Sequence, residues 1–101
     1  MSAAGDWLDR HTEHAPAELQ ARVREYALMA RPAEPLPFAL AAAGRTALER
    51  VVAHPGDRSV ALDLLAADAL ITLALLAQAQ RAPGELAAFA TSVLQAVRPA
   101  A

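Results

Sequence analysis

LLAADALITLALLAQAQR, residues 64–81, is the stretch of this 101-residue chain that decides the fold. Sixteen of its eighteen residues are uncharged; Asp68 lies inside the run and Arg81 closes it. Neither proline nor glycine interrupts it, and its main residues, Leu and Ala, are strong helix formers. With the residues just before it, the stretch predicts one long helix over about 58–81, roughly 36 Å long at 1.5 Å per residue.

The same stretch approaches the length of a membrane span. Residues 60–79 number 20, which is about what a bilayer requires. However, Asp63 and Asp68 would each cost roughly 2.5–3.5 kcal/mol near the bilayer centre, and the uncharged run over residues 69–80 is too short to cross. We therefore predict a buried helix of a soluble protein, with a membrane span as the minor alternative.

Prolines and glycines divide the chain into about five helical segments. Within them apolar side chains recur every three or four residues, and no strand pattern or internal repeat is present. The predicted fold is all-α: a single domain over 1–101, forming a small bundle of four to five helices with one long, mostly buried helix. Gly44 falls inside the third helix at a cost of up to about 1 kcal/mol relative to Ala, so we expect close helix contact there. The expected helices cover about residues 4–13, 16–30, 37–53, 58–81 and 84–97.

Composition excludes several classes of function. The chain has no cysteine, which rules out disulfides, thiolate metal sites and a cysteine nucleophile. Its net charge of −2 offers no basic surplus for nucleic acid. All nine basic residues are Arg, and Lys and Asn are absent, which indicates a GC-rich bacterial genome. The N-terminus lacks the pattern of a signal peptide, so we expect a cytoplasmic protein.

Charge is unevenly distributed: residues 1–58 hold 15 of the 20 Asp, Glu and Arg residues, and residues 59–101 hold 5. A helix that is apolar on nearly all sides needs cover on nearly all sides. The other helices can supply part of it, and a second copy in a C2 homodimer can supply the rest. The alternative is the central helix of a self-sufficient monomer. The expected interface residues are Leu64, Leu65, Asp68, Thr72, Leu75, Leu76, Phe89 and Leu94.

Asp68 and Thr72 lie one turn apart on a helical wheel, on the apolar side opposite Asp63 and Arg81. An unpaired buried carboxylate is expensive. We therefore expect Asp68 to meet an Arg, a Tyr hydroxyl, a helix N-terminus or its dimer mate. The alternatives are a polar handle in an apolar ligand pocket between helices, or exposure at a bundle edge. The candidate ligand-binding residues are Trp7, Tyr26, Asp68 and Thr72.

A second cluster of polar residues is DWLDRHTEH, residues 6–14. His11 and His14 are helical neighbours at a spacing of three, and the carboxylates around them are possible further ligands for Zn or Ni. The HExxH motif is absent. The alternative is a set of solvated polar residues on an N-terminal helix.

No motif indicates catalysis, since no glycine-rich loop and no nucleophile elbow is present. Helix 16–30 carries Arg22 and Arg24, but Glu18 and Glu25 offset them, which disfavours DNA binding. Glu18 and Arg22 are spaced as an i,i+4 pair, which we expect on the exposed side of this helix. The predicted function is that of a non-enzymatic helical bundle without a cofactor, acting through self-association or protein–protein interaction via helices 58–81 and 84–97. The alternatives are a binding protein for a small apolar ligand or for a His/carboxylate-bound metal ion.

Overall fold

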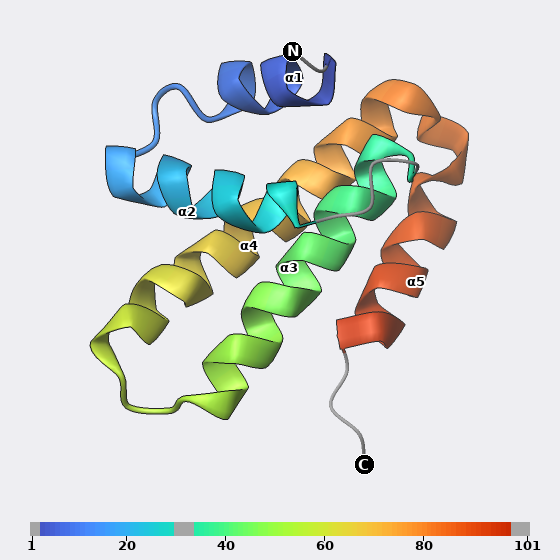
Figure 1. Ribbon diagram of the computed structural model, residues 1–101. Coiled ribbons are helices and arrows are strands. Elements are labelled where there is room, and N and C mark those ends of the chain that lie inside the picture. The colour runs from blue at the N-terminus through green and yellow to red at the C-terminus, as the bar shows by residue number, and fades with distance from the viewer. Residues whose placement is uncertain (1–2, 30–33, 98–101) are drawn as a thin grey trace.

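The computed structural model describes residues 3–29 and 34–97, and within these ranges the chain forms helices and no strand. The all-α bundle is therefore confirmed, and the long helix has the predicted bounds (Figure 1). The elements in chain order are α1 Ala3–His11, α2 Ala17–Leu28, α3 Leu36–Ala53, α4 Arg58–Arg81, the 3₁₀ turn η1 Pro83–Glu85, and α5 Leu86–Val97.

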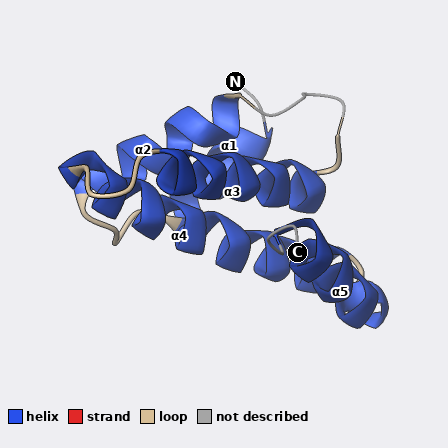
Figure 2. Cartoon of the chain, turned by 90° about the horizontal axis from the view of Figure 1, so that it is seen from below, coloured by secondary structure: helices blue, strands red, loops and turns tan. Residues whose placement is uncertain are grey.

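Helices α3 and α4 form an antiparallel hairpin at the centre of the molecule (Figures 1 and 2). The connection is short because Gly56 turns the chain at φ 88°, a left-handed conformation that glycine adopts without a steric penalty. Asp57 then begins α4 as its N-cap, where its Oδ1 accepts a hydrogen bond from the Ser59 N–H at 3.0 Å.

The contact between α3 and α4 is made largely by small residues. At Gly44, an added Cβ would lie 2.8 Å from Ile71 Cδ1 and 3.3 Å from Leu70 Cβ. The close approach predicted for this glycine is therefore confirmed, and it explains why α3 tolerates a residue that weakens an isolated helix. The buried residues of the two helices include Leu40, Ala43, Gly44, Ala47, Ala66, Ala67, Leu70, Leu73, Ala74 and Ala77.

Helices α2 and α5 pack on opposite sides of this hairpin (Figure 1). From α2 the core receives Val23 and Tyr26, and from α5 it receives Phe89 and Val93. Helix α1 adds Leu8.

Polar contacts attach α1 to the rest of the bundle. Asp9 on α1 forms an ion pair with Arg24 on α2, and the indole N–H of Trp7 donates to Gln80 Oε1 on α4 at 2.9 Å. The small N-terminal helix is therefore held by side chains from both α2 and α4.

Helix α4 turns one face toward the core and the opposite face outward. The inward face includes Asp63 and Gln78, whereas Leu64 and Leu65 point outward. In the single chain the leucine side is therefore exposed, and its expected role as an interface with a partner stays a prediction. The buried alanines on this inward face let α3 approach closely. Asp63 and Gln78 form hydrogen bonds within the chain, to Tyr26 and to the Ala82 carbonyl.

One helix among the described residues, α4, has the length and hydropathy of a membrane span. The core helix of a globular bundle passes the same test. Its carboxylate at Asp63 is buried among partners from α2, and this arrangement fits a helix packed in protein.

Candidate functional site

The buried carboxylate of α4 is Asp63, which is 2% exposed and lies against two side chains of α2. The Tyr26 hydroxyl donates to Asp63 Oδ1 at 2.8 Å. The Arg22 guanidinium donates to the same oxygen and forms an ion pair with it. Arg50 of α3 lies over the Tyr26 ring at 5.3 Å from its centroid. Three helices therefore meet at one charged, hydrogen-bonded cluster.

Burial and hydrogen bonding act in opposite directions on this carboxylate. Burial disfavours the charged form and by itself would raise the pKa of Asp63, but the hydrogen bonds from Tyr26 and Arg22 outweigh it and hold the pKa below its ordinary value. Burial, followed by the hydrogen bond to Asp63, raises the pKa of Tyr26. The hydrogen bond to Asp63 likewise raises the pKa of Arg22. Asp63 is thus held as an anion, and the cluster links α2 to α4 structurally.

Sequence reasoning missed this cluster because it treated Arg22 as an exposed partner of Glu18. In the structure Arg22 pairs with Asp63 and, at 3.4 Å, with Glu25. A signal was present: Arg22 is four residues before Tyr26, which belongs to the apolar stripe of α2, so both lie on the face that packs against α4.

The exposed surface of α4, here called the outer α4 face, consists of positions opposite the core. Its leucines Leu64, Leu65 and Leu76 are 50%, 55% and 39% exposed. Isolated exposed leucines are ordinary, whereas several on one helical face make that face a candidate interaction surface. The exposed residues of this face are Ala61, Leu64, Leu65, Asp68, Thr72 and Leu76.

Asp68 and Thr72 lie together on the outer α4 face and are both exposed. Among the described residues, neither side chain has a hydrogen-bond or ion-pair partner. The expectation that Asp68 finds a partner inside its own chain is therefore wrong, because the wheel position that it occupies faces outward. A partner from a second chain stays a prediction.

The remaining predicted interface residues occupy different environments. Leu75 is half-buried, and Leu94 of α5 is 65% exposed. Phe89 is buried and meets Phe38 of α3 edge to face, with ring centroids 5.1 Å apart. Within the chain, Phe89 therefore serves the α3–α5 contact.

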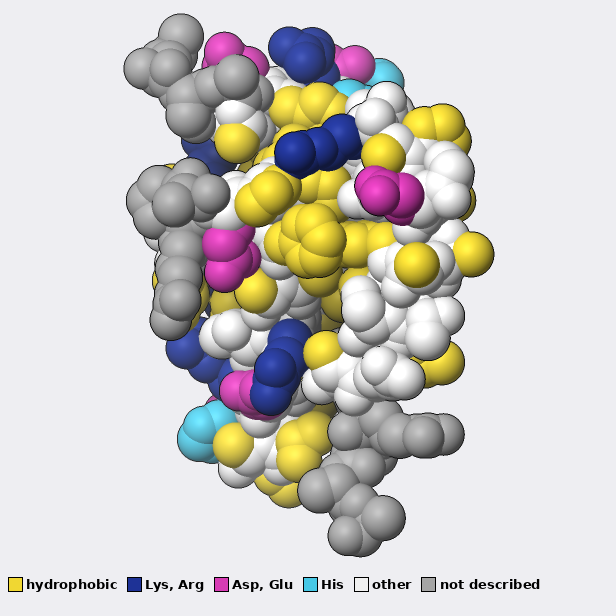
Figure 3. Space-filling model, turned by 90° about the vertical axis from the view of Figure 1, so that its right-hand side faces the viewer, with side chains coloured by type: hydrophobic (Ala, Val, Ile, Leu, Met, Phe, Trp, Pro, Cys, Tyr) yellow, Lys and Arg dark blue, Asp and Glu magenta, His cyan; other side chains and the backbone are white. Residues whose placement is uncertain are grey.

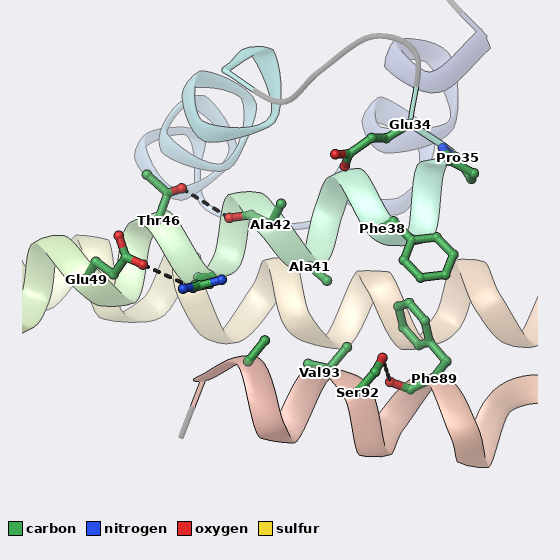
Figure 4. Close-up of a pocket in the computed structure, with 12 residues that line it drawn as sticks. Glu34, Pro35, Phe38, Ala41, Ala42, Thr46, Glu49, Phe89, Ser92 and Val93 are labelled. Atoms are coloured by element: carbon green, nitrogen blue, oxygen red, sulfur yellow. Dashed lines mark hydrogen bonds and ion pairs between the residues drawn. The ribbon is translucent and has the colours of Figure 1, made fainter. Parts of the chain in front are cut away.

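A groove of about 630 Å³ runs between α3 and α5 (Figure 4). The phenyl rings of Phe38 and Phe89 lie at one end of it, and Glu49 lies toward the other. Glu49 forms an ion pair with Arg45 at 3.1 Å. Ser92 donates its hydroxyl to its own helix at the Phe89 carbonyl. Figure 3 shows this side of the molecule with apolar side chains at its centre and charged side chains around them. The residues that line the groove are Glu34, Pro35, Phe38, Ala41, Ala42, Arg45, Thr46, Glu49, Phe89, Ser92, Val93 and Ala96.

The four predicted ligand-binding residues do not converge. Tyr26 contacts Asp63, whereas Trp7 contacts Gln80, 17 residues and about 25 Å further along α4. Asp68 and Thr72 are on the opposite, exposed face of the same helix. Sequence spacing could not reveal this separation because it depends on where α1 and α2 dock.

His11 and His14 are both exposed. The His11 ring stacks on Trp7 with centroids 4.0 Å apart, and its Nδ1 hydrogen-bonds to the Trp7 carbonyl at 2.8 Å. His14 lies 3.4 Å from Glu13. Within the described ranges, no three His, Asp or Glu side chains gather in a metal-binding arrangement. The structure thus brings no third ligand to the two histidines.

Comparison with known proteins adds no relative to this picture. No family model, no curated protein and no solved structure matches the chain. The case for a function therefore depends on the surfaces described above.

Proposed function

We propose that this protein is a non-enzymatic helical module that self-associates as a homodimer through the outer α4 face. The observation that carries the proposal is the group of half-exposed leucines, Leu64, Leu65 and Leu76, on the longest helix of the bundle. Fully burying a leucine side chain contributes about 1.5–3 kcal/mol. A second copy supplies the same surface, and a two-fold axis lets the face cover itself.

The size of the face bounds the strength of such a dimer. From Ala61 to Leu76 it extends over 16 residues, or about 23 Å of helix. Stable, specific interfaces bury about 1,200–2,000 Å² in total, and one pair of helices this short lies at the lower end of that range. We therefore expect a dimer whose population depends on protein concentration.

The experiment is sedimentation velocity from low micromolar to several hundred micromolar, on the unmodified chain and two variants. Leu65→Glu places a charge in the outer α4 face. Val52→Glu places the same charge at a 74% exposed site on α3, which makes it the matched control. We expect the unmodified chain and Val52→Glu to dimerise alike and Leu65→Glu to stay monomeric. A chain that is monomeric at every concentration contradicts the proposal.

A second candidate function is the binding of a small apolar ligand in the α3–α5 groove. The observation that favours it is the aromatic pair, in which Phe38 is 49% exposed beside the buried Phe89. Native mass spectrometry of protein purified from its own host is the test. A retained small molecule that is lost in Phe38→Ala supports this function, and a bare mass in both proteins contradicts it.

The proposal places the protein in the cytoplasm, as an adaptor or assembly module whose partner is a second copy or another protein. It assigns no cofactor and no catalysis. Fractionation of host cells followed by immunodetection tests the location. Recovery with the membrane fraction would contradict it and would direct attention to α4 as a span.

A further inference from the structure

A seam with heptad spacing runs along α4 through four residues of the outer α4 face and two half-buried neighbours, Leu75 and Ala79. The intervals from one residue to the next along this seam are 4, 3, 4, 3 and 4, as in the a and d positions of a coiled coil. Each of these residues is exposed or half-buried in the single chain, so the seam is available to a second helix at a small crossing angle. The seam residues are Ala61, Leu65, Asp68, Thr72, Leu75 and Ala79.

The seam is also symmetric about Leu70. Alanines lie nine residues before and after it, and leucines lie five residues before and after it. The central pair, two residues before and after, is Asp68 and Thr72. In an antiparallel pair of identical helices centred here, each residue meets the residue at the mirrored position of the other chain. Alanine meets alanine, leucine meets leucine, and Asp68 meets Thr72.

Hydrogen-bonding capacity matches at the central pair. The other three threonines, all described, donate their hydroxyls to the backbone carbonyl four residues earlier. Thr72 makes no such bond among the described residues, and Asp68 has no donor there. A carboxylate accepts and a hydroxyl donates, so an antiparallel pair satisfies both groups twice. A parallel pair would place Asp68 against Asp68, where two like charges repel.

We infer that two copies of this chain pack their α4 helices antiparallel about Leu70, with each Asp68 carboxylate accepting a hydrogen bond from Thr72 of the partner subunit. This inference rests on the proposed self-association and adds its orientation and register. The role of the polar pair is specificity, since a polar layer in an apolar seam penalises shifted and parallel alignments.

Disulfide trapping tests the register directly because the chain has no cysteine of its own. Ala61→Cys and Ala79→Cys are prepared as separate proteins, oxidised alone, and oxidised as a mixture. The two sites are 18 residues apart, about 27 Å along one helix, too far to join within a chain. We expect the mixture to give a 61–79 cross-link and each protein alone to give at least tenfold less. A mixture of Ala79→Cys with Ala17→Cys, whose site is exposed on α2, is the control. Its cross-linking measures the background from random collisions.

The outcomes distinguish self-association from its antiparallel register. If sedimentation shows no dimer, both the proposed function and the register are contradicted. A dimer that gives 61–61 or 79–79 cross-links as readily as 61–79 leaves self-association standing and overturns the antiparallel register.

A double variant tests the role of the polar pair. Asp68→Leu with Thr72→Val makes the seam apolar throughout, and we expect association at least as tight as in the unmodified chain. We also expect loss of register, so that 61–61 and 79–79 cross-links rise toward the level of 61–79. Cross-linking that stays confined to 61–79 would show that Asp68 and Thr72 do not set the alignment.

Discussion

Removing one oxygen atom from the Asp63 cluster gives the most informative test of the fold. Tyr26→Phe keeps the buried ring, which is 1% exposed, and deletes only the hydroxyl that donates to Asp63 at 2.8 Å. Asp63 keeps its ion pair with Arg22. The change therefore isolates one hydrogen bond to a buried carboxylate.

The expected cost follows from the kind of bond. A hydrogen bond to a charged group contributes about 1.5–3 kcal/mol, and because Arg22 still satisfies the carboxylate we expect the lower end, about 1.5 kcal/mol. For a domain of this size, 1 kcal/mol lowers Tm by about 4–8 °C, so Tyr26→Phe should lower it by about 6–12 °C. Urea unfolding followed by the fluorescence of Trp7, the sole tryptophan, gives the free energy of unfolding.

The directions of the two pKa shifts determine how the stabilisation from this cluster changes with pH. Because the folded-state pKa of Asp63 is lowered from 3.8, its stabilisation is present above that value and is lost as pH falls through the folded pKa. The pKa of Tyr26 is raised from 10.0, so its stabilisation is present below that value and is lost as pH rises through the folded pKa. The difference in the free energy of unfolding between Tyr26→Phe and the unmodified chain should be largest near neutral pH and should shrink at acidic and at alkaline pH. Acid unfolding of Tyr26→Phe should begin at higher pH than that of the unmodified chain. Without the Tyr26 hydroxyl, one of the two hydrogen bonds that lower the pKa of Asp63 is lost, while burial still raises it.

The control is Thr46→Val, which removes an exposed hydroxyl bonded to its own helix at the Ala42 carbonyl. We expect it to change the free energy of unfolding by no more than about 0.5 kcal/mol. Two results would refute the stabilising role of the Asp63 cluster. One is a loss of free energy of unfolding in Tyr26→Phe as small as in this control, and the other is acid unfolding of Tyr26→Phe at the same pH as the unmodified chain.

Three further changes test other contacts. Gly44→Ala gains about 1 kcal/mol of helix propensity but overpacks against Ile71, at a typical cost of 1–3 kcal/mol; we expect net destabilisation in urea melts, reduced when Ile71→Val is added, and a more stable single variant would contradict the close contact. Asp57→Ala should lose about 1 kcal/mol by removing the N-cap, whereas Asp57→Asn should lose little; equal losses would argue against capping. Gln80→Ala should cost under about 0.5 kcal/mol at this exposed site and shift Trp7 emission to longer wavelength, and an unchanged spectrum would argue against the indole hydrogen bond.

Local patterns in the sequence predict the helices well. The bounds of α4 agree because Asp57 is a good N-cap and APGE, residues 82–85, breaks the run. The close contact at Gly44 also follows, because a glycine inside a helix weakens it unless packing compensates.

The face that α4 turns inward could not be predicted the same way. Leucine and alanine are both apolar, so the helical wheel alone does not show which of the two sides packs against the rest of its own chain. The structure buries the alanine side, because small residues allow helices to approach closely and Asp63 on that side is paired with Arg22 and Tyr26 of α2. Choosing between the two faces requires knowing where α2 docks, which is tertiary information. The sequence also could not show that Trp7 and Tyr26 lie apart, because that separation depends on where α1 and α2 dock.

The short turn at Gly56 has a consequence for the route of folding. Since few residues separate α3 from α4, the contacts next to the turn close a small loop at little entropic cost, and the contacts farther along the hairpin, such as Gly44 with Ile71, follow them. The α3–α4 hairpin is therefore the expected nucleus, with α2 arriving later. Until it arrives, Asp63 remains hydrated, so the docking of α2 removes a carboxylate from water and supplies its partners in the same step. We expect that step, and not hairpin formation, to make the refolding rate depend on pH.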